Sequence, residues 1–185
     1  METIVLASQS PRRKQLLEWA EIPFEVIVKE TNEAFDPVMP VAQIPIHIAR
    51  NKVLAVQPGL EHRIILGADT IVVLDGKVIG KPTDRNDAVN ILEGLSGARH
   101  EVVTGVVIRK GDREASFSDI TEVYFHALTR KEIEFYVDKY KPYDKAGAYA
   151  IQEWIGVVGI QSISGDFYNV MGLPVSRVVR ELRNF

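Results

Sequence analysis

Short hydrophobic runs alternate along the chain with the repeating hydrophobic and polar pattern of helices. Apolar runs rich in β-branched residues predict strands at 3–7, 24–28, 63–67, 71–74, 77–79, 101–109 and 116–125. Apolar positions three or four residues apart predict helices at 11–20, 46–56, 84–92, 129–140 and 174–182. The two patterns alternate without a repeat, a low-complexity tract or a Gly/Ser linker. We therefore expect one α/β domain over 1–185, a mixed sheet with packed helices whose strand order stays open.

Turn and cap residues mark several of these boundaries. Asp75-Gly76 fits the type I′ turn of a hairpin. Ser10 is predicted to cap the first helix, with Pro11 in its first turn, and Thr129-Arg-Lys-Glu132 is a capping box. Pro45 predicts that the second helix is continuous only from about residue 46.

Composition narrows the classes of function. The chain has 185 residues, 46% hydrophobic and 25% charged, as in an ordinary globular protein. It has no cysteine, which excludes disulfides, thiolate nucleophiles and sulfur-bound zinc, and its four histidines show no ligand spacing. A net charge of −3 argues against a nucleic-acid partner. No apolar run approaches the roughly 20 residues of a membrane helix, and no signal-peptide pattern opens the chain, so we expect a cytoplasmic protein without a membrane segment.

Two arginines, Arg12 and Arg13, fall in the first turn of a predicted helix, where the helix dipole favours acidic residues. Two guanidinium groups, the hydroxyls of Ser8 and Ser10 and the free N–H groups of the helix N-terminus form a candidate polyphosphate site. The alternative is a pair of solvated arginines, with Ser10 serving only as a cap.

An aspartate, Asp69, follows a buried run in Gly67-Ala-Asp-Thr70. Because aspartate is depleted in strand interiors, we expect Asp69 at a strand end, where a carboxylate holds a metal or orients a water. The alternative is a turn or capping aspartate that bonds nearby backbone. Position alone leaves both interpretations open.

Further candidate groups are spread along the chain. Lys81 lies between a glycine and a proline, which suits a charge aimed at a phosphate, but the glycine spacing of a Walker loop is missing. The other candidates are the cations Lys52 and Lys145, the acid Glu33 and the amide Gln152. Each alone is more often a solvated or structural polar side chain. Residues 165–174 read as a glycine-bounded loop before the last helix.

Six stretches carry a family resemblance when they are taken together and in order. They are Leu6-Ala-Ser-Gln-Ser-Pro-Arg-Arg13, Gly67-Ala-Asp-Thr70, Gly80-Lys-Pro82, Leu95-Ser-Gly97 with His100 and Thr104, Asp144-Lys-Ala-Gly-Ala-Tyr149 with Ile151-Gln152, and Val170-Met-Gly-Leu-Pro174. In this combination the chain resembles the Maf family of nucleoside triphosphate pyrophosphatases.

The resemblance implies an α/β fold with a mixed, strongly curved sheet flanked by helices and two lobes around a central cleft, as in ITPase-like proteins, usually as a homodimer. It implies hydrolysis of a nucleoside triphosphate to the monophosphate and pyrophosphate with a divalent metal, Mg or Mn. By the resemblance, Asp69 accepts a proton and, with Glu33, falls near the metal. The remaining assignments are phosphate contacts by Ser8, Arg13, Lys52 and Lys81, and substrate choice by Arg12, Thr70 and Gln152.

Thr70 and Gln152 resemble the branch of the family that acts on dTTP, UTP and modified pyrimidine nucleotides. Glu153-Trp154 departs from the glycine that follows the glutamine in many members, so the pocket entrance is expected to differ. Two alternatives stay open: a 7-methyl-GTP pyrophosphatase, and a nucleotide-binding regulator of septum formation in which hydrolysis is slow or incidental.

Overall fold

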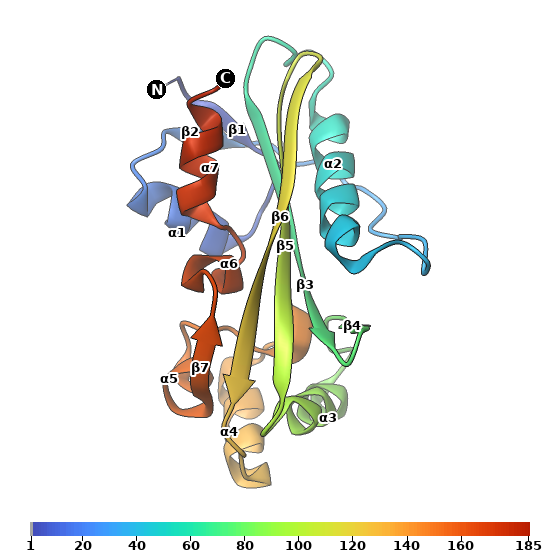
Figure 1. Ribbon diagram of the computed structural model, residues 1–185, viewed down its shortest axis with the longest axis vertical. Helices are drawn as coiled ribbons and strands as arrows, with labels where there is room; N and C mark the ends of the chain where they lie inside the picture. Colours follow the sequence, from blue (N-terminus) through green and yellow to red (C-terminus); the bar gives the residue numbers. More distant parts are fainter. Residues whose placement is uncertain (1) are drawn as a thin grey trace. The chain divides into compact units, whose positions relative to one another are not determined.

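The computed structural model describes residues 2–185 and has a mixed α/β fold (Figure 1). In chain order its elements are β1 (Ile4–Leu6), α1 (Pro11–Trp19), β2 (Phe24–Val26), η1 (Val41–Gln43), α2 (Ile44–Val56), β3 (Ile65–Leu74), β4 (Lys77–Ile79), α3 (Arg85–Leu95), β5 (Arg99–Lys110), β6 (Arg113–Phe125), α4 (Arg130–Tyr140), η2 (Ala146–Ala148), α5 (Trp154–Gly159), β7 (Ile160–Ser164), α6 (Phe167–Met171) and α7 (Val175–Leu182). The predicted α/β class is confirmed.

Within the described residues, seven strands form one sheet in the order β2-β1-β3-β5-β6-β7, and β4 pairs with β3. Strand β1 is parallel to β2 and to β3, and the β1–β3 register pairs Val5 with Ile65. The β3–β4 and β6–β7 pairs are antiparallel. The sheet is therefore mixed, as predicted.

The chain divides into two compact units. The first comprises Met1–Thr70, Thr104–Asp119 and Gly172–Phe185, and the second comprises Ile71–Val103 and Ile120–Met171. The long strands β3, β5 and β6 contribute residues to both.

In the first unit, α2 lies against the sheet where two glycines leave room for it. A Cβ at Gly67 would lie 2.6 Å from Val53 Cγ2 and 2.7 Å from the Ala49 carbonyl oxygen, and a Cβ at Gly105 would overlap the backbone of residues 45–46. The buried core that α2 shares with the strands comprises Val5, Ala7, Ile46, Ala49, Val53, Val56, Ile65 and Val107. Burial of this apolar face fixes how α2 docks on the sheet.

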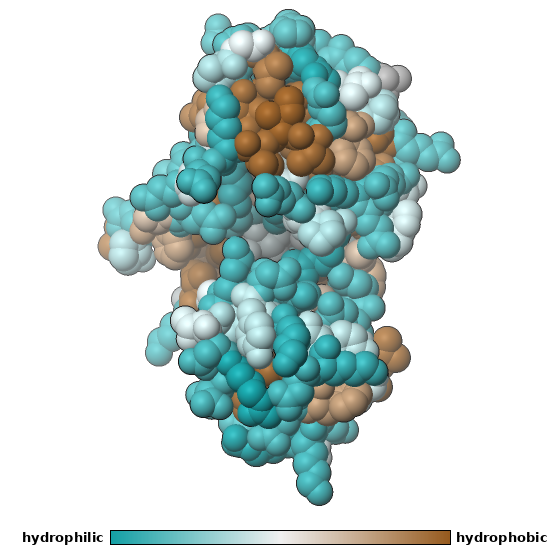
Figure 2. All heavy atoms as spheres, turned by 180° about the vertical axis from the view of Figure 1, so that it is seen from behind, coloured by the Kyte–Doolittle hydropathy of each residue, from teal (hydrophilic) through white to brown (hydrophobic). Residues whose placement is uncertain are grey.

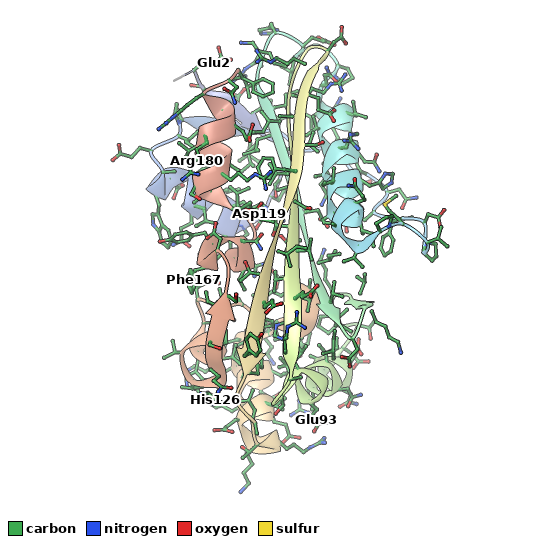
Figure 3. All side chains as sticks on the ribbon, in the orientation of Figure 1. Glu2, Glu93, Asp119, His126, Phe167 and Arg180 are labelled. Atoms are coloured by element: carbon green, nitrogen blue, oxygen red, sulfur yellow. The ribbon has the colours of Figure 1, made fainter. Side chains whose placement is uncertain are left out.

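Helix α7 of the same unit is fixed to β6 by one arginine. Arg177 pairs with Asp119, which is labelled in Figure 3, and its guanidinium lies 4.1 Å from the centroid of the Phe117 ring. Val178 and Leu182 of the helix are buried. The predicted last helix is confirmed. Its attachment to β6 also anchors the segment just before α7.

In the second unit, α3 packs against α4, and a buried aromatic cluster lies among the strands and η2. The rings of His100, Phe125 and Tyr149 meet edge to face with centroids 5.1 to 5.4 Å apart. Gly147 has φ 69°, and a Cβ there would lie 2.9 Å from Val72 Cγ2, so only glycine fits this approach to β3.

Most local signals in the sequence are confirmed. Asp75 and Gly76 have φ values of 49° and 76°, as the predicted type I′ hairpin requires. The Thr129 capping box is formed in full at the start of α4. Pro11 lies in the first turn of α1.

Several predicted boundaries are wrong, each for a local reason. Asp69 lies inside β3 and not at a strand end, because the runs at 63–67 and 71–74, predicted as separate strands, belong to one continuous strand. Ser10 takes the cap position of α1 without a side-chain cap bond. Helix α2 begins at Ile44, because a proline in the first turn loses no helical hydrogen bond.

The predicted loop at 165–174 contains helix α6, which the sequence analysis missed together with η2, α5 and β7. The signal for α6 was Asp166, whose carboxylate accepts a hydrogen bond from the Tyr168 N–H at 2.7 Å. Such a bond satisfies a free donor at the start of a helix.

Hydrophilic side chains cover most of the face that is turned away in Figure 1, with a hydrophobic area in its upper part (Figure 2). Across residues 2–185, every helix falls short of the length and apolar character that a bilayer-spanning helix requires.

Candidate active site

The first unit joins three predicted site residues in one charged cluster. Lys52 of α2 places its Nζ 2.7 Å from Asp69 Oδ1 on β3 and 2.9 Å from Glu33 Oε1. The side chains of Lys52 and Asp69 are 18% and 15% exposed, whereas that of Glu33 is 48% exposed. The close approach of α2 to Gly67 explains the contact, because it brings the helix over the strand just before Asp69. One ammonium group thus lies between two carboxylates.

The two carboxylates fit a Mg or Mn ion that also binds a phosphate-containing ligand. Magnesium is commonly bound through one or two carboxylates, with substrate phosphates and waters completing its octahedron. In the described part of the chain, no three histidine, cysteine, aspartate or glutamate side chains gather as a ready metal site. Glu33 and Asp69 therefore match a shared site better than an all-protein cage.

A second cluster in the same unit surrounds Arg13, which is 8% exposed. Its Nε donates to the Gly172 carbonyl oxygen at 2.8 Å, its Nη1 to Ser8 Oγ at 3.1 Å and its Nη2 to Thr70 Oγ1 at 3.0 Å. Thr70 Oγ1 also lies 2.9 Å from Thr104 Oγ1. Burial lowers the pKa of Arg13, and the charge of Asp69 opposes this. Arg13 therefore fixes the hydroxyl groups of Ser8 and Thr70, which are both predicted site residues.

Arg12 differs from its neighbour. Its side chain is partly exposed, and its Nε is buried without a hydrogen-bond partner among the described residues. A buried donor without a partner costs free energy that a bound acceptor would recover. The first turn of α1 contains no acidic side chain that would neutralise Arg12. An anionic ligand at this helix start would supply both an acceptor and the favoured charge.

The other two predicted site residues, Lys81 and Gln152, belong to the second unit and are exposed. The loop before Lys81 is tied to η2 by a hydrogen bond from the Gly147 N–H to the Gly80 carbonyl oxygen at 3.2 Å. Gln152 lies in a turn that the Glu153 N–H closes onto the Ala150 carbonyl oxygen at 3.1 Å. Both side chains are thus presented by short, tethered segments.

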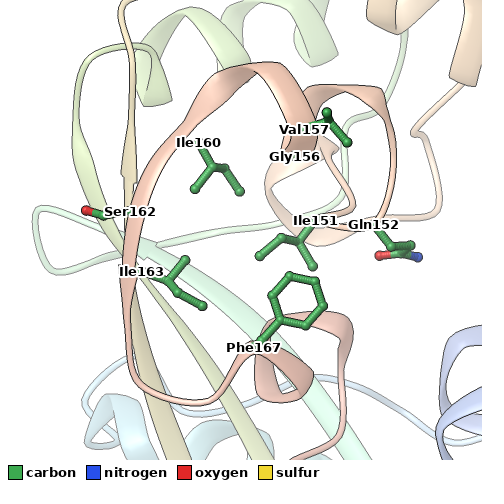
Figure 4. Close-up of a pocket in the computed structure, with 8 residues that line it drawn as sticks. All are labelled: Ile151, Gln152, Gly156, Val157, Ile160, Ser162, Ile163 and Phe167. Carbon is green, nitrogen blue, oxygen red and sulfur yellow. The ribbon is translucent and has the colours of Figure 1, made fainter. Parts of the chain in front are cut away.

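The turn of Gln152 borders an apolar pocket of about 380 Å³ in the second unit (Figure 4). Its lining residues are Ile151, Gln152, Gly156, Val157, Ile160, Ser162, Ile163 and Phe167. Ile151 points toward Phe167 and Ile163, whereas the amide of Gln152 points away from them. The turn therefore presents an apolar side chain on one side and an amide on the other.

His100 is a buried neutral base in the second unit. It is 1% exposed, its Nε2 lies 2.7 Å from the Tyr149 hydroxyl, and burial lowers its pKa from 6.5 to about 4. Burial also raises the pKa of the Tyr149 hydroxyl. Both groups are therefore uncharged at neutral pH.

We expect the free energy of unfolding to fall as the pH drops below about 6.5, because of His100. The unfolded histidine binds a proton near that pH, whereas the folded one resists protonation until about pH 4. The unfolded state thus binds more protons in this window, and the loss approaches about 3 kcal/mol at its lower end. Denaturant unfolding between pH 7.5 and 4 measures it.

His100→Gln, which keeps a neutral hydrogen-bonding group beside Tyr149, should flatten this dependence, whereas His62→Gln at an exposed position should not. Parallel pH profiles for the parent protein and His100→Gln would assign the effect to other groups.

Four residues that contact predicted site residues or their neighbours have no role predicted from the sequence. Thr104 and Gly172 stand in recognised stretches, but their contacts with Thr70 and Arg13 depend on strand order. Tyr136 and Glu153 pair with each other next to Gln152. The departure from glycine at position 153 was the one signal that pointed to this pair.

A mixed α/β fold in which cations of two helices meet polar side chains of a central strand is typical of proteins that bind anionic ligands. Residues 3–185 match the family described as Maf-like protein. The chain belongs to the Maf family.

Several curated relatives cover nearly the whole chain. A dTTP/UTP pyrophosphatase of Cytophaga hutchinsonii is 49% identical over 97% of this chain and 82% of its own length. A dTTP/UTP pyrophosphatase of Parabacteroides distasonis is 46% identical over 98% and 95%, and one of Bacillus cytotoxicus is 46% identical over 100% and 96%. Among solved structures, a HAM1 protein from Coxiella burnetii matches with a TM-score of 0.54 and 16% identity over 100% of both chains, which shows a common fold.

Proposed function

We propose that this chain hydrolyses dTTP, UTP and modified pyrimidine nucleoside triphosphates to the monophosphate and pyrophosphate. The observation that carries the proposal is the junction of two clusters at adjacent residues of β3. Asp69 joins the cluster of Lys52 and Glu33, and Thr70 joins that of buried Arg13. Relatives that bear the name dTTP/UTP pyrophosphatase, at 46% and 49% identity, support the choice of substrate.

In the proposed reaction, a water oxygen attacks the α-phosphorus and pyrophosphate leaves with the bridging oxygen. Asp69 accepts the proton that the attacking water loses. Negative charge grows on the phosphate oxygens and on the leaving group, so fixed cations lower the barrier. Arg12 offers a buried Nε that has no hydrogen-bond partner within residues 2–185, and Lys52 and Lys81 add positive charge. Ser8 contacts a phosphate from the position that Arg13 gives it.

Glu33 and Asp69 would hold the divalent cation, Mg or Mn, together with the phosphates of the substrate. When bound, the cation would supply positive charge where the phosphate oxygens gain negative charge. Lys52 orients both carboxylates, because its Nζ is within hydrogen-bond distance of each.

The proposed choice of base rests on Gln152 in the second unit. A primary amide has one donor side and one acceptor side, which complement the N3–H and a carbonyl of uracil or thymine. We expect Gln152→Ala to raise KM for UTP and dTTP about tenfold and to weaken the preference for pyrimidines more than the binding of phosphate. Equal losses on all bases would contradict this role.

The experiment that tests the function is pyrophosphate release from UTP, dTTP, CTP, GTP, ATP and 7-methyl-GTP, with Mg or Mn and with EDTA. The proposal expects release from UTP and dTTP that EDTA abolishes. Preferred turnover of 7-methyl-GTP would assign the chain to that branch of activity. Binding of nucleotide without turnover on any of the six would favour a nucleotide-binding regulator of septum formation.

The same proposal places the enzyme in the cytoplasm, as expected from the sequence pattern, and as a homodimer, as the family resemblance implies. Sedimentation of the purified chain would give twice the 20.7 kDa mass if the dimer forms.

A further inference from the structure

We propose that the hydroxyl of Tyr136 clamps the turn that carries Gln152, which makes Tyr136 a positioning residue for nucleotide choice. The effect on nucleotide choice rests on the proposed function. The clamp itself is a property of the second unit, and all the residues that form it belong to that unit.

The clamp joins the two ends of one turn. Ile151 and Gln152 are its central residues, and the Glu153 N–H donates to the Ala150 carbonyl oxygen at 3.1 Å. The Tyr136 hydroxyl oxygen accepts from the Ala150 N–H at 3.2 Å, and the hydroxyl donates to the Glu153 carboxylate. A single side-chain oxygen therefore holds the first and last residues of the turn whose exposed tip is Gln152.

Burial makes this clamp rigid. Tyr136 is 0% exposed, and its ring stacks on that of Tyr140 with centroids 5.0 Å apart. Water cannot readily replace a hydrogen bond to a buried hydroxyl, because the released groups would be left without partners. The packed ring fixes the position of the Tyr136 hydroxyl, and the hydrogen bonds of that hydroxyl fix the turn.

The residues around Glu153 orient its carboxylate toward Tyr136. It takes the cap position of α5, yet its side chain makes no cap hydrogen bond there and faces Tyr136 instead. Lys145 places its Nζ 3.6 Å from Glu153 Oε1 and 2.9 Å from Asp144 Oδ1. A glycine at position 153 could make neither contact. The sequence departure noted at this position thus supplies one of the two bonds of the clamp.

The next pair along the chain strengthens the same attachment. Phe135 precedes Tyr136 on α4, and its ring meets that of Trp154 edge to face with centroids 4.9 Å apart. Two consecutive residues of α4, Phe135 and Tyr136, therefore contact the two residues that follow Gln152 in the chain. The helix is a suitable support because its capping box fixes its start.

The consequence for function concerns the orientation of the Gln152 amide. An exposed amide on an untethered turn samples many orientations, and ordering it on binding costs free energy. A clamped turn presents the amide in a narrow range of orientations, which favours the base whose edge fits.

Tyr136→Phe tests the clamp because it removes only the hydroxyl and keeps the packed ring. Two readouts apply: amide hydrogen exchange at Ala150 and Glu153, and kcat/KM for UTP relative to CTP and GTP. We expect exchange at both amides to become about tenfold faster, and the preference for UTP to fall about tenfold through KM with little change in kcat. The matched control is Tyr140→Phe, which removes a hydroxyl from the stacked neighbour and should change neither readout.

Glu153→Leu provides a second, independent variant, since it removes the carboxylate and leaves the Tyr136–Ala150 bond. It should shift both readouts in the same direction by a smaller factor. Unchanged exchange in Tyr136→Phe would overturn the clamp, and faster exchange with an unchanged preference for UTP would overturn the positioning role. If the parent protein releases no pyrophosphate from any nucleotide, the proposed function fails, and hydrogen exchange alone then confirms or overturns the clamp.

Discussion

Replacing Asp69 by asparagine is expected to lower kcat for pyrophosphate release from UTP and dTTP by about 10³-fold. Asparagine has the size of aspartate but cannot accept the proton of the attacking water, and it removes the ion pair with Lys52 Nζ at 2.7 Å. It also replaces a charged oxygen of the candidate metal site by a neutral one. Steady-state pyrophosphate release measures the loss, and calorimetric titration should still detect nucleotide binding.

Asp75→Asn is the matched control for Asp69→Asn. Asp75 stands in the hairpin turn that follows the same strand and has φ 49°, a conformation that asparagine adopts readily. This substitution should leave both the free energy of unfolding and kcat unchanged. A kcat for Asp69→Asn within a few fold of the parent value would remove Asp69 from the proton-accepting role.

The local elements could be predicted from sequence because their signals are local. The Asp75-Gly76 hairpin and the Thr129 capping box depend only on residues within four positions of one another, and both formed as predicted. The missed elements α5 and β7 lack such signals. Helix α5 has no side-chain cap bond, because the carboxylate of Glu153 is engaged by Tyr136, 17 residues away.

The position of Asp69 inside β3 could not be predicted from sequence because its cause is a contact across the fold. An aspartate is unfavourable in a strand interior by its own propensity. Here Lys52 of α2 pairs with it, and α2 reaches the strand only because Gly67 has no side chain. Residue type selected Asp69, Lys52 and Glu33 as candidates, but only the packing of helix on sheet brings both carboxylates to the Lys52 ammonium group.

The largest stability effect is expected from Arg13→Met, with Arg12→Met as its matched control. Sequence alone treats the two arginines as one feature, a pair of cations at the unfavourable end of a helix dipole. The structure separates them, because Arg13 donates three hydrogen bonds to Gly172, Ser8 and Thr70, whereas the buried Nε of Arg12 has no partner among residues 2–185.

Arg13→Met should lower the free energy of unfolding by about 3 kcal/mol, because two buried acceptors and one partly buried acceptor lose a charged donor. It should also lower kcat, since Thr70 and Ser8 lose the group that holds them. Arg12→Met keeps the aliphatic stem and removes a cation from the first turn, so the free energy of unfolding should stay within about 0.5 kcal/mol.

The control should nevertheless lose function, with KM for UTP raised about tenfold or more by the absence of a guanidinium at the phosphates. Urea unfolding and steady-state kinetics on the two variants separate the roles. Equal destabilisation by both substitutions would mean that Arg12 is also structural. Unchanged stability in Arg13→Met would mean that Ser8, Thr70 and Gly172 find other partners, and the paired arginines at this helix start would then serve the substrate alone.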